Sequence, residues 1–474
     1  MTVARRILKN TLFLLGSGII GQGLGFVVTI YLARVLGVKG FGAIAYAMAF
    51  TTYFYMLGNL GLPLLGTRAI ASDRSQLTPM FSTIVILRLV LSCLGFVLLL
   101  LIGLLVEHSH QNRQLIVLFG LGVFPAACLL DWMFQGLERM QVISASRIMT
   151  ALVAVGLIVT LIKSTDQLLW VPGIYVAAAW IGALVLIVLS KPYAGQGGGR
   201  MDWRQGVRML KEALPIGASM LLIQMLYFID TVMMGMLQME AEVGLYNAGF
   251  KIIVFITTCG AFYYDAIFPV MCNYYTTSRD ALQRLSAQTA RLMVSIGLPI
   301  GVGGTLLAQP LMVMVYGQAY ADAAVGFQIL IWFAAIMYLN MIYDRGLWVC
   351  GRYKTYLAII ATEVVLNIAL NAFLIPRFGM IGAACCKVAV TLLGFVLYYR
   401  VFNGIVSVPF GRYLFRPALA CLAMATVLWG GLILHWHVLL LMGVGGAVYI
   451  AILWGVRGIT GADVQLVRSL LLKR

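Results

Sequence analysis

The chain has 474 residues, of which 62% are hydrophobic and only 10% are charged, whereas about 25% of residues are charged in a typical soluble protein. This composition excludes a soluble globular protein and predicts an all-α polytopic membrane protein, because too few polar groups are present to cover a water-exposed surface. The net charge of +17 does not predict a nucleic-acid partner, because the basic residues are dispersed singly between apolar runs.

Apolar runs of about 20 residues, the length that crosses a bilayer, recur along the whole chain. The first run is too long for the core of a signal peptide, so we interpret it as a retained span. About fourteen spans are expected, at residues 10–36, 41–64, 80–106, 114–136, 142–162, 168–190, 212–236, 244–270, 291–315, 322–343, 354–374, 379–400, 413–434 and 438–456.

The loops between these spans carry an asymmetric distribution of basic residues. If the spans alternate in direction, 25 of the 33 Lys and Arg residues fall on the side of the N-terminus, and only five fall on the opposite side. Because positively charged loops remain in the cytoplasm, this distribution predicts a multi-pass protein with both termini in the cytoplasm.

The longest internal loop, residues 191–211, contains several glycines and basic residues. It predicts a cytoplasmic linker between an N-terminal six-helix lobe, 1–190, and a C-terminal six-helix lobe, 212–402. Two additional transmembrane helices are expected within 412–456, followed by a cytoplasmic amphipathic tail at 457–474.

A weak internal repeat supports two related halves. The second span opens with Gly42-Ala43-Ile44-Ala45-Tyr46-Ala47, and the eighth opens with Gly244-Leu245-Tyr246-Asn247-Ala248-Gly249, so that the two glycines are 202 positions apart. Paired six-helix halves are typical of transporters that alternate between two open states.

The motifs of common enzyme classes are missing from the sequence. It contains no P-loop, no HExxH, no GxSxG and no Cys/His cluster with the spacing of a metal site. The paired histidines, His108 with His110 and His435 with His437, are interpreted as polar loop residues. We therefore expect no enzymatic activity, no metal and no cofactor.

Charged residues inside the spans are the main candidates for function, because each costs at least about 2.5 kcal/mol at the bilayer centre. Comparable depth in adjacent antiparallel helices predicts three ion pairs, which are Arg88 with Asp131, Asp230 with Lys251, and Glu363 with Lys387. Asp265 follows Lys251 by fourteen residues, so both lie on one face of the eighth span. These charges either neutralise one another or mark a substrate path.

The N-terminal region resembles the oligosaccharide and polysaccharide flippases, the Wzx-type branch of the superfamily that also contains the MATE exporters. The resemblance rests on Gly21-Gln22-Gly23, Ala33-Arg34-Val35-Leu36-Gly37, Gly40-Phe41-Gly42, Tyr53-Phe54, Leu60-Gly61-Leu62 and Gly66-Thr67-Arg68-Ala69-Ile70-Ala71. In the second half it rests on Pro215, Asp230, Val243-Gly244-Leu245-Tyr246-Asn247-Ala248 and Lys251.

The resemblance implies a MATE-like fold and a flippase of the bacterial inner membrane. Such a protein carries an undecaprenyl-diphosphate-linked oligosaccharide from the cytoplasmic to the periplasmic leaflet by alternating access, for the assembly of O-antigen, capsule or exopolysaccharide. Its partners would be the lipid-linked oligosaccharide, bilayer lipid, H+ or Na+ as a coupling ion, and a polysaccharide polymerase or chain-length regulator.

Two other functions remain open. A cation-coupled MATE-type exporter of small molecules would have a cavity dominated by carboxylates. A membrane-bound glycan polymerase would have a long outer catalytic loop, which the sequence lacks.

A flippase for a diphosphate-linked lipid requires fixed positive charge for the headgroup, because the diphosphate is costly to place in hydrocarbon. We expect a cationic substrate cavity formed by Arg34, Arg68, Arg88, Lys251 and Lys387. The carboxylates Asp131, Asp230, Asp265 and Glu363 would serve as ion-pair partners or as coupling sites.

The predicted topology can be tested with reporter fusions at two loop positions. A fusion at His110 should report the periplasm, and a fusion at Gly198 should report the cytoplasm, because an odd number of expected spans separates them. Signals from one and the same side would show that the assignment of spans is wrong.

Overall fold

The computed structural model describes residues 3–193, 203–456 and 458, and these residues form helices joined by short turns. Within them, twelve helices or helical stretches are long and apolar enough to cross a membrane. Two of these stretches each contain a non-helical glycine, Gly37 or Gly379, at which two helices meet. The all-helical fold and the expected number of about fourteen spans are thus confirmed for the described residues.

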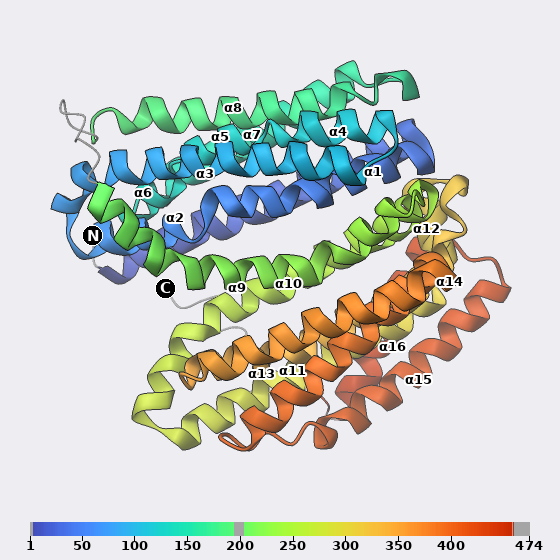
Figure 1. Ribbon diagram of the computed structural model, residues 1–474. Helices are drawn as coiled ribbons and strands as arrows, with labels where there is room; N and C mark the ends of the chain where they lie inside the picture. The colour runs from blue at the N-terminus through green and yellow to red at the C-terminus, as the bar shows by residue number, and fades with distance from the viewer. Residues whose placement is uncertain (1–2, 194–202, 457, 459–474) are drawn as a thin grey trace. The chain divides into compact units, whose positions relative to one another are not determined.

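Tertiary contacts divide the chain into two compact units, residues 1–244 and 245–474. The helices of the first unit are labelled in Figure 1 and have the bounds α1 (Val3–Asn59), α2 (Leu62–Ser72), α3 (Leu77–Val106), α4 (His110–Gly120), α5 (Val123–Cys128), α6 (Asp131–Gly136), α7 (Met140–Leu161), α8 (Trp170–Ser190) and α9 (Trp203–Met236). Short 3-10 turns lie at η1 (Arg74–Gln76) and η2 (Thr165–Gln167).

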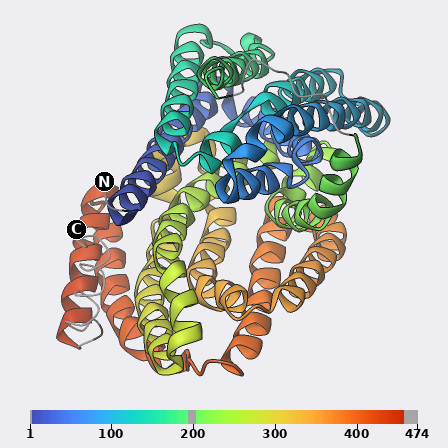
Figure 2. The same ribbon diagram turned by 90° about the vertical axis from the view of Figure 1, so that its left-hand side faces the viewer.

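The second unit continues the all-helical pattern. Its helices are α10 (Glu240–Thr277), whose first turn belongs to the first unit, α11 (Arg279–Leu306), α12 (Ala308–Tyr316), α13 (Ala323–Val349), α14 (Tyr353–Asn403), α15 (Gly411–Ile433) and α16 (Val438–Gly455), with a 3-10 turn at η3 (Gln318–Tyr320). The last two helices pack side by side, and α15 also packs on α11 (Figure 2).

The break at Gly37 separates the first two spans without a loop. Gly37 has φ 68° and ψ −178°, a conformation that costs little for glycine but is strained for residues with a Cβ. Gly379, with φ 53°, makes the corresponding break inside α14. A single glycine therefore replaces each of two expected inter-span loops.

Three spans depart from the expected pattern. The second, expected over 41–64, is interrupted at Leu60 and Gly61 between α1 and α2. The fourth span, expected to be continuous over 114–136, is divided into α4, α5 and α6. The ninth, expected at 291–315, begins earlier as α11 and is interrupted at Leu307 before α12. In the sequence, Gly120, Gly122 and Pro125 mark the interruption of the fourth span, since such residues weaken a helix interior.

The C-terminal part of the expected linker is helical, because α9 begins at Trp203. This helix packs against α1, α2 and α3, and therefore groups with the first unit. The lobe boundaries expected from the sequence remain a prediction. The centre of the expected linker, 194–202, and nearly all of the expected tail, 457–474, lie outside the described residues.

Candidate functional site

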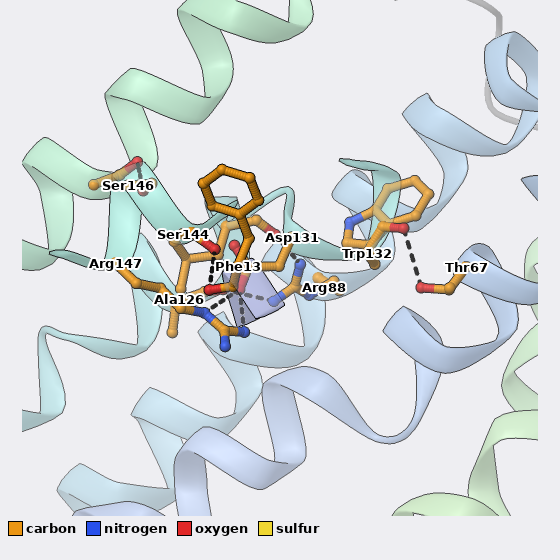
Figure 3. A network of polar contacts seen from close by, with 11 residues as sticks. Phe13, Thr67, Arg88, Ala126, Asp131, Trp132, Ser144, Ser146 and Arg147 are labelled. Carbon is orange, nitrogen blue, oxygen red and sulfur yellow. Dashed lines mark hydrogen bonds and ion pairs between the residues drawn. The ribbon is translucent and has the colours of Figure 1, made fainter. Parts of the chain in front are cut away.

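The polar centre of the first unit is built around Arg88 on α3, which is only 3% exposed. Its guanidinium donates hydrogen bonds to the carbonyl oxygens of Leu129 and Ala126, each at 2.6 Å, and to Oδ1 of Asn59 at 2.7 Å. Figure 3 shows Arg88 beside the break between α5 and α6.

The position of Arg88 follows from the interruption of the fourth span. A helix break frees carbonyl oxygens, and each unsatisfied backbone group costs several kcal/mol in an apolar medium. A guanidinium has five donors and keeps its charge, so one side chain can satisfy several carbonyls. Arg88 therefore stabilises the break between α5 and α6.

The expected ion pair between Arg88 and Asp131 is wrong. Asp131, the first residue of α6, instead pairs with Arg147 on α7, with 2.7 Å between Nη2 and Oδ2. Nε of Arg147 donates to the same oxygen at 3.1 Å. The carbonyl oxygens at the helix break bind Arg88 instead, and Asp131 forms its ion pair with a residue of the next helix, α7 (Figure 3).

The Arg147–Asp131 pair borders a cavity of about 520 Å³ in the first unit. The rest of its lining is mainly small or apolar and comes from α1, α7 and α8, including Gly21, Ala151 and Ala178. The Arg147 side chain is 52% exposed. The cavity thus combines an accessible guanidinium with apolar walls. The sequence analysis did not name Arg147 as a candidate, although this residue lies within the expected fifth span.

The remaining expected cations of the first unit lie at the surface of the described structure. Arg34 is exposed on α1, one turn before Gly37, and Arg68 is exposed on α2. Neither lines the cavity that Arg147 borders.

In the second unit, buried polar side chains face one another across the two halves of α14. One half contributes Glu363, Asn367 and Asn371 at intervals of four residues, which is one helix face. The other half contributes Lys387, Thr391 and Tyr398. We call this set of six buried residues the α14 polar seam.

Glu363 lies at one end of this seam. It accepts a hydrogen bond from the Tyr398 hydroxyl at 3.3 Å, and Oε1 occupies the space that a Cβ on Gly394 would need. Gly394 lies seven residues, or roughly 10 Å along the helix, beyond Lys387. The expected pairing of Glu363 with Lys387 is therefore wrong.

Lys387 is 2% exposed and lies over two aromatic rings. Its Nζ is 5.2 Å from the ring centroid of Phe250 and 5.8 Å from that of Phe333. The negative faces of these rings attract the ammonium group. Part of its stabilisation therefore comes from aromatic residues, which carry no formal charge and do not appear when charged residues alone are paired.

Asp344 on α13 is a residue that the sequence analysis missed. Asp344 lies on α13, which packs against α14, the helix that carries Glu363. The expected span ended at residue 343, so Asp344 and the adjacent Arg345 were placed outside it. In the structure, the backbone N–H of Arg345 donates to the Asp344 carboxylate.

Three further expected residues stay predictions. Asp230 is fully buried on α9 in the first unit, whereas Lys251 is partly buried on α10 in the second unit. Asp265 lies on α10, but its side chain is outside what the structure describes. The expected coupling of Asp230 to Lys251 and the role of Asp265 are therefore not decided.

Comparison with known proteins adds independent findings. Residues 7–275 match the model of the family described as polysaccharide biosynthesis protein, and residues 215–373 match the MatE model. A "Putative O-antigen transporter" of Escherichia coli (strain K12) is 21% identical over 77% of this chain and 88% of its own length. A "Probable flippase" of Haloferax volcanii is 22% identical over 81% of each chain.

Solved structures of a flippase and of a multidrug transporter share the fold. The lipid II flippase MurJ, in an inward closed conformation, superposes with a TM-score of 0.76 at 12% identity, over 93% of this chain and 97% of its own. An inward-facing multidrug resistance transporter of the MATE family superposes with a TM-score of 0.64 at 14% identity, over 81% and 95% of the two chains. At these identities the similarity shows the fold alone, and confirms the expected MATE-like arrangement.

The role of Arg88 predicts a specific loss of stability. In Arg88→Gln, three hydrogen bonds from a charged donor are lost and the Leu129 carbonyl loses the partner that Arg88 provides, so we expect destabilisation by about 3 kcal/mol or more. Arg147→Gln should cost less than about 1 kcal/mol, because Arg147 is half exposed. Thermal unfolding of the detergent-purified variants measures the difference, and equal melting temperatures for the two would contradict the proposed role of Arg88.

Proposed function

The chain belongs to the polysaccharide biosynthesis protein family, and from this membership we propose that it is a flippase for a lipid-linked oligosaccharide. It would carry an undecaprenyl-diphosphate-linked glycan from the cytoplasmic to the periplasmic leaflet by alternating access, for the assembly of a cell-surface polysaccharide. Relatives named as an O-antigen transporter and a flippase support this function.

The observation that carries the proposal is the cavity that Arg147 borders. A prenyl chain is stable among apolar side chains, whereas its diphosphate needs charge-assisted hydrogen bonds. The cavity offers both, since Arg147 lies beside walls of glycine, alanine and valine, and the diphosphate would replace the Asp131 carboxylate as the partner of its guanidinium. Arg147 thereby replaces Arg88 in our hypothesis, because Arg88 is buried and both of its Nη atoms are hydrogen-bonded within the protein.

The proposal leaves different roles for the other expected cations. Arg34 and Arg68 are exposed, so they would act at most in attracting the anionic headgroup. Lys251 and Lys387 would contribute positive charge from the second unit. Localisation in the bacterial inner membrane with both termini in the cytoplasm, and cooperation with a polymerase or chain-length regulator, are parts of the same proposal.

A coupling ion would act at the α14 polar seam. Glu363 is buried in a helix pair and bonded to a tyrosine rather than to a cation, and intramembrane carboxylates of this kind are common proton sites. We propose H+ on Glu363 as the coupling step, with Na+ as the alternative and Asp265 as a second candidate carboxylate.

The second candidate function is a cation-coupled exporter of small molecules. The MatE match over residues 215–373 favours it, but that match covers less of the chain than the polysaccharide match does. Proteoliposomes separate the two functions, because an exporter would move ethidium in response to an ion gradient, whereas a flippase would move a lipid-linked glycan.

The headgroup role of Arg147 predicts a transport defect without loss of the protein. Arg147→Gln should lower delivery of the glycan to the outer leaflet by about tenfold or more, because a charge-assisted contact to the diphosphate is lost. Arg147→Lys should retain part of the activity. The control is Arg139→Gln, which removes an exposed arginine that does not line the cavity. Normal delivery by well-expressed Arg147→Gln would contradict the proposed site.

Protonation of Glu363 predicts a change in energy coupling. Glu363→Gln keeps the size and the hydrogen-bonding capacity of the side chain but cannot exchange a proton, so transport into proteoliposomes should no longer respond to a pH gradient. Asp166→Asn, on the exposed η2 turn, is the matched control. A response of Glu363→Gln equal to that of the control would show that the coupling ion acts elsewhere.

A further inference from the structure

The first turn of α10 is docked onto α1 through two reciprocal glycine contacts. A Cβ on Gly42 would overlap the carbonyl oxygen of Glu240, and a Cβ on Gly244 would overlap the carbonyl oxygen of Val38. Val38 and Glu240 are 202 positions apart, as are Gly42 and Gly244. The internal repeat is therefore also a symmetric contact, which only glycine permits at this distance.

This contact holds Glu240 beside a polar cavity of about 340 Å³ in the first unit. The polar side chains that line it are Lys39, Gln111, Asn112, Thr165 and Glu240. Asn112 is 1% exposed and its Nδ2 donates to Oε1 of Glu240 at 3.0 Å. The cavity thus joins four segments, which the predicted topology assigns to the periplasmic end.

The chemistry of the lining selects among ligands. It combines an ammonium, a carboxylate, two carboxamides and a hydroxyl, which together donate and accept hydrogen bonds. Glu240 is hydrogen-bonded to a neutral carboxamide, whereas Asp131 is neutralised by Arg147, so Glu240 would repel a phosphate. The described residues contain no group of three His, Cys, Asp or Glu side chains that could hold a metal ion. A polyhydroxylated ligand fits such a mixed lining, and the volume lies within the range of small-molecule sites.

We propose that this cavity is a periplasmic-end saccharide subsite, which binds sugar residues of the glycan after its headgroup has crossed. The inference rests on the proposed flippase function. Glu240 and Lys39 would contact sugar hydroxyls, Asn112 orients the Glu240 carboxylate, and the Gly42 contact positions the turn that carries Glu240. This subsite is separate from the cavity that Arg147 borders, since the two share no lining residue.

The test is hydrogen exchange of the full-length protein in nanodiscs, followed by mass spectrometry. The probe is the oligosaccharide of the producing strain after release from its diphosphate carrier by mild acid, with maltotriose as the unrelated sugar and farnesyl diphosphate as the carrier without sugar. We expect the released glycan to protect the peptides around residues 107–113 and 163–168, with neither of the other compounds doing so.

Two variants of the lining should weaken this protection. In Glu240→Gln and in Lys39→Gln, the glycan concentration for half-maximal protection should rise about tenfold, because each loses a charged partner for a hydroxyl. Glu242→Gln and Lys163→Gln are the matched controls, since both lie near the cavity in sequence but do not line it. Lys39 is exposed, so its variant should fold even if Glu240→Gln does not.

The outcomes separate this inference from the proposed function. Glycan delivery by the native protein together with no protection of these peptides would overturn the subsite and leave the flippase standing. Protection by farnesyl diphosphate would overturn it as well, because the cavity would then bind the headgroup. If the native protein neither delivers the glycan nor moves it in proteoliposomes, the proposed function fails, whatever the exchange experiment shows.

Discussion

The bond network of Arg88 is the interaction on which the first unit depends. The fourth span is interrupted twice, and the interruption between α5 and α6 ends the helical hydrogen-bond ladder near the carbonyl oxygens of Ala126 and Leu129. In a medium without water, such groups must be satisfied by other protein groups. Arg88 does so from α3, and it also ties the end of α1 to the same point through Asn59. One buried side chain thereby joins three spans.

This arrangement determines which charges are left for function. Because Arg88 donates its hydrogen bonds mainly to backbone carbonyls, Asp131 pairs with Arg147 instead. This ion pair lines a cavity of the first unit. In the second unit, aromatic rings help to stabilise Lys387, and Glu363 accepts a hydrogen bond from Tyr398. In both units, a buried cation is stabilised by groups other than the carboxylate expected to pair with it. That carboxylate then bonds to another side chain, Arg147 in the first unit and Tyr398 in the second.

Glycine has two different uses in this fold. At Gly37 it permits a backbone conformation with positive φ, and a side chain there would meet no neighbouring atom within 4 Å. At Gly42 and Gly244 the backbone is helical, and the absence of a side chain lets two chain segments touch through their carbonyl oxygens. The first use reverses the chain between spans, and the second places a carboxylate beside a polar cavity.

The amino-acid sequence alone determined the class of the protein, the approximate number of spans and the family, because the length of an apolar run and its local motifs are properties of contiguous residues. Only the tertiary structure decided the partners of the charges. Depth along a helix can be counted from the sequence, but the rotation of each helix and the groups exposed by its breaks cannot, so Arg88 was paired with Asp131 and Lys387 with Glu363. Asp344 and Arg147 were missed for a related reason, since the sequence does not show which groups of neighbouring helices a charged side chain faces.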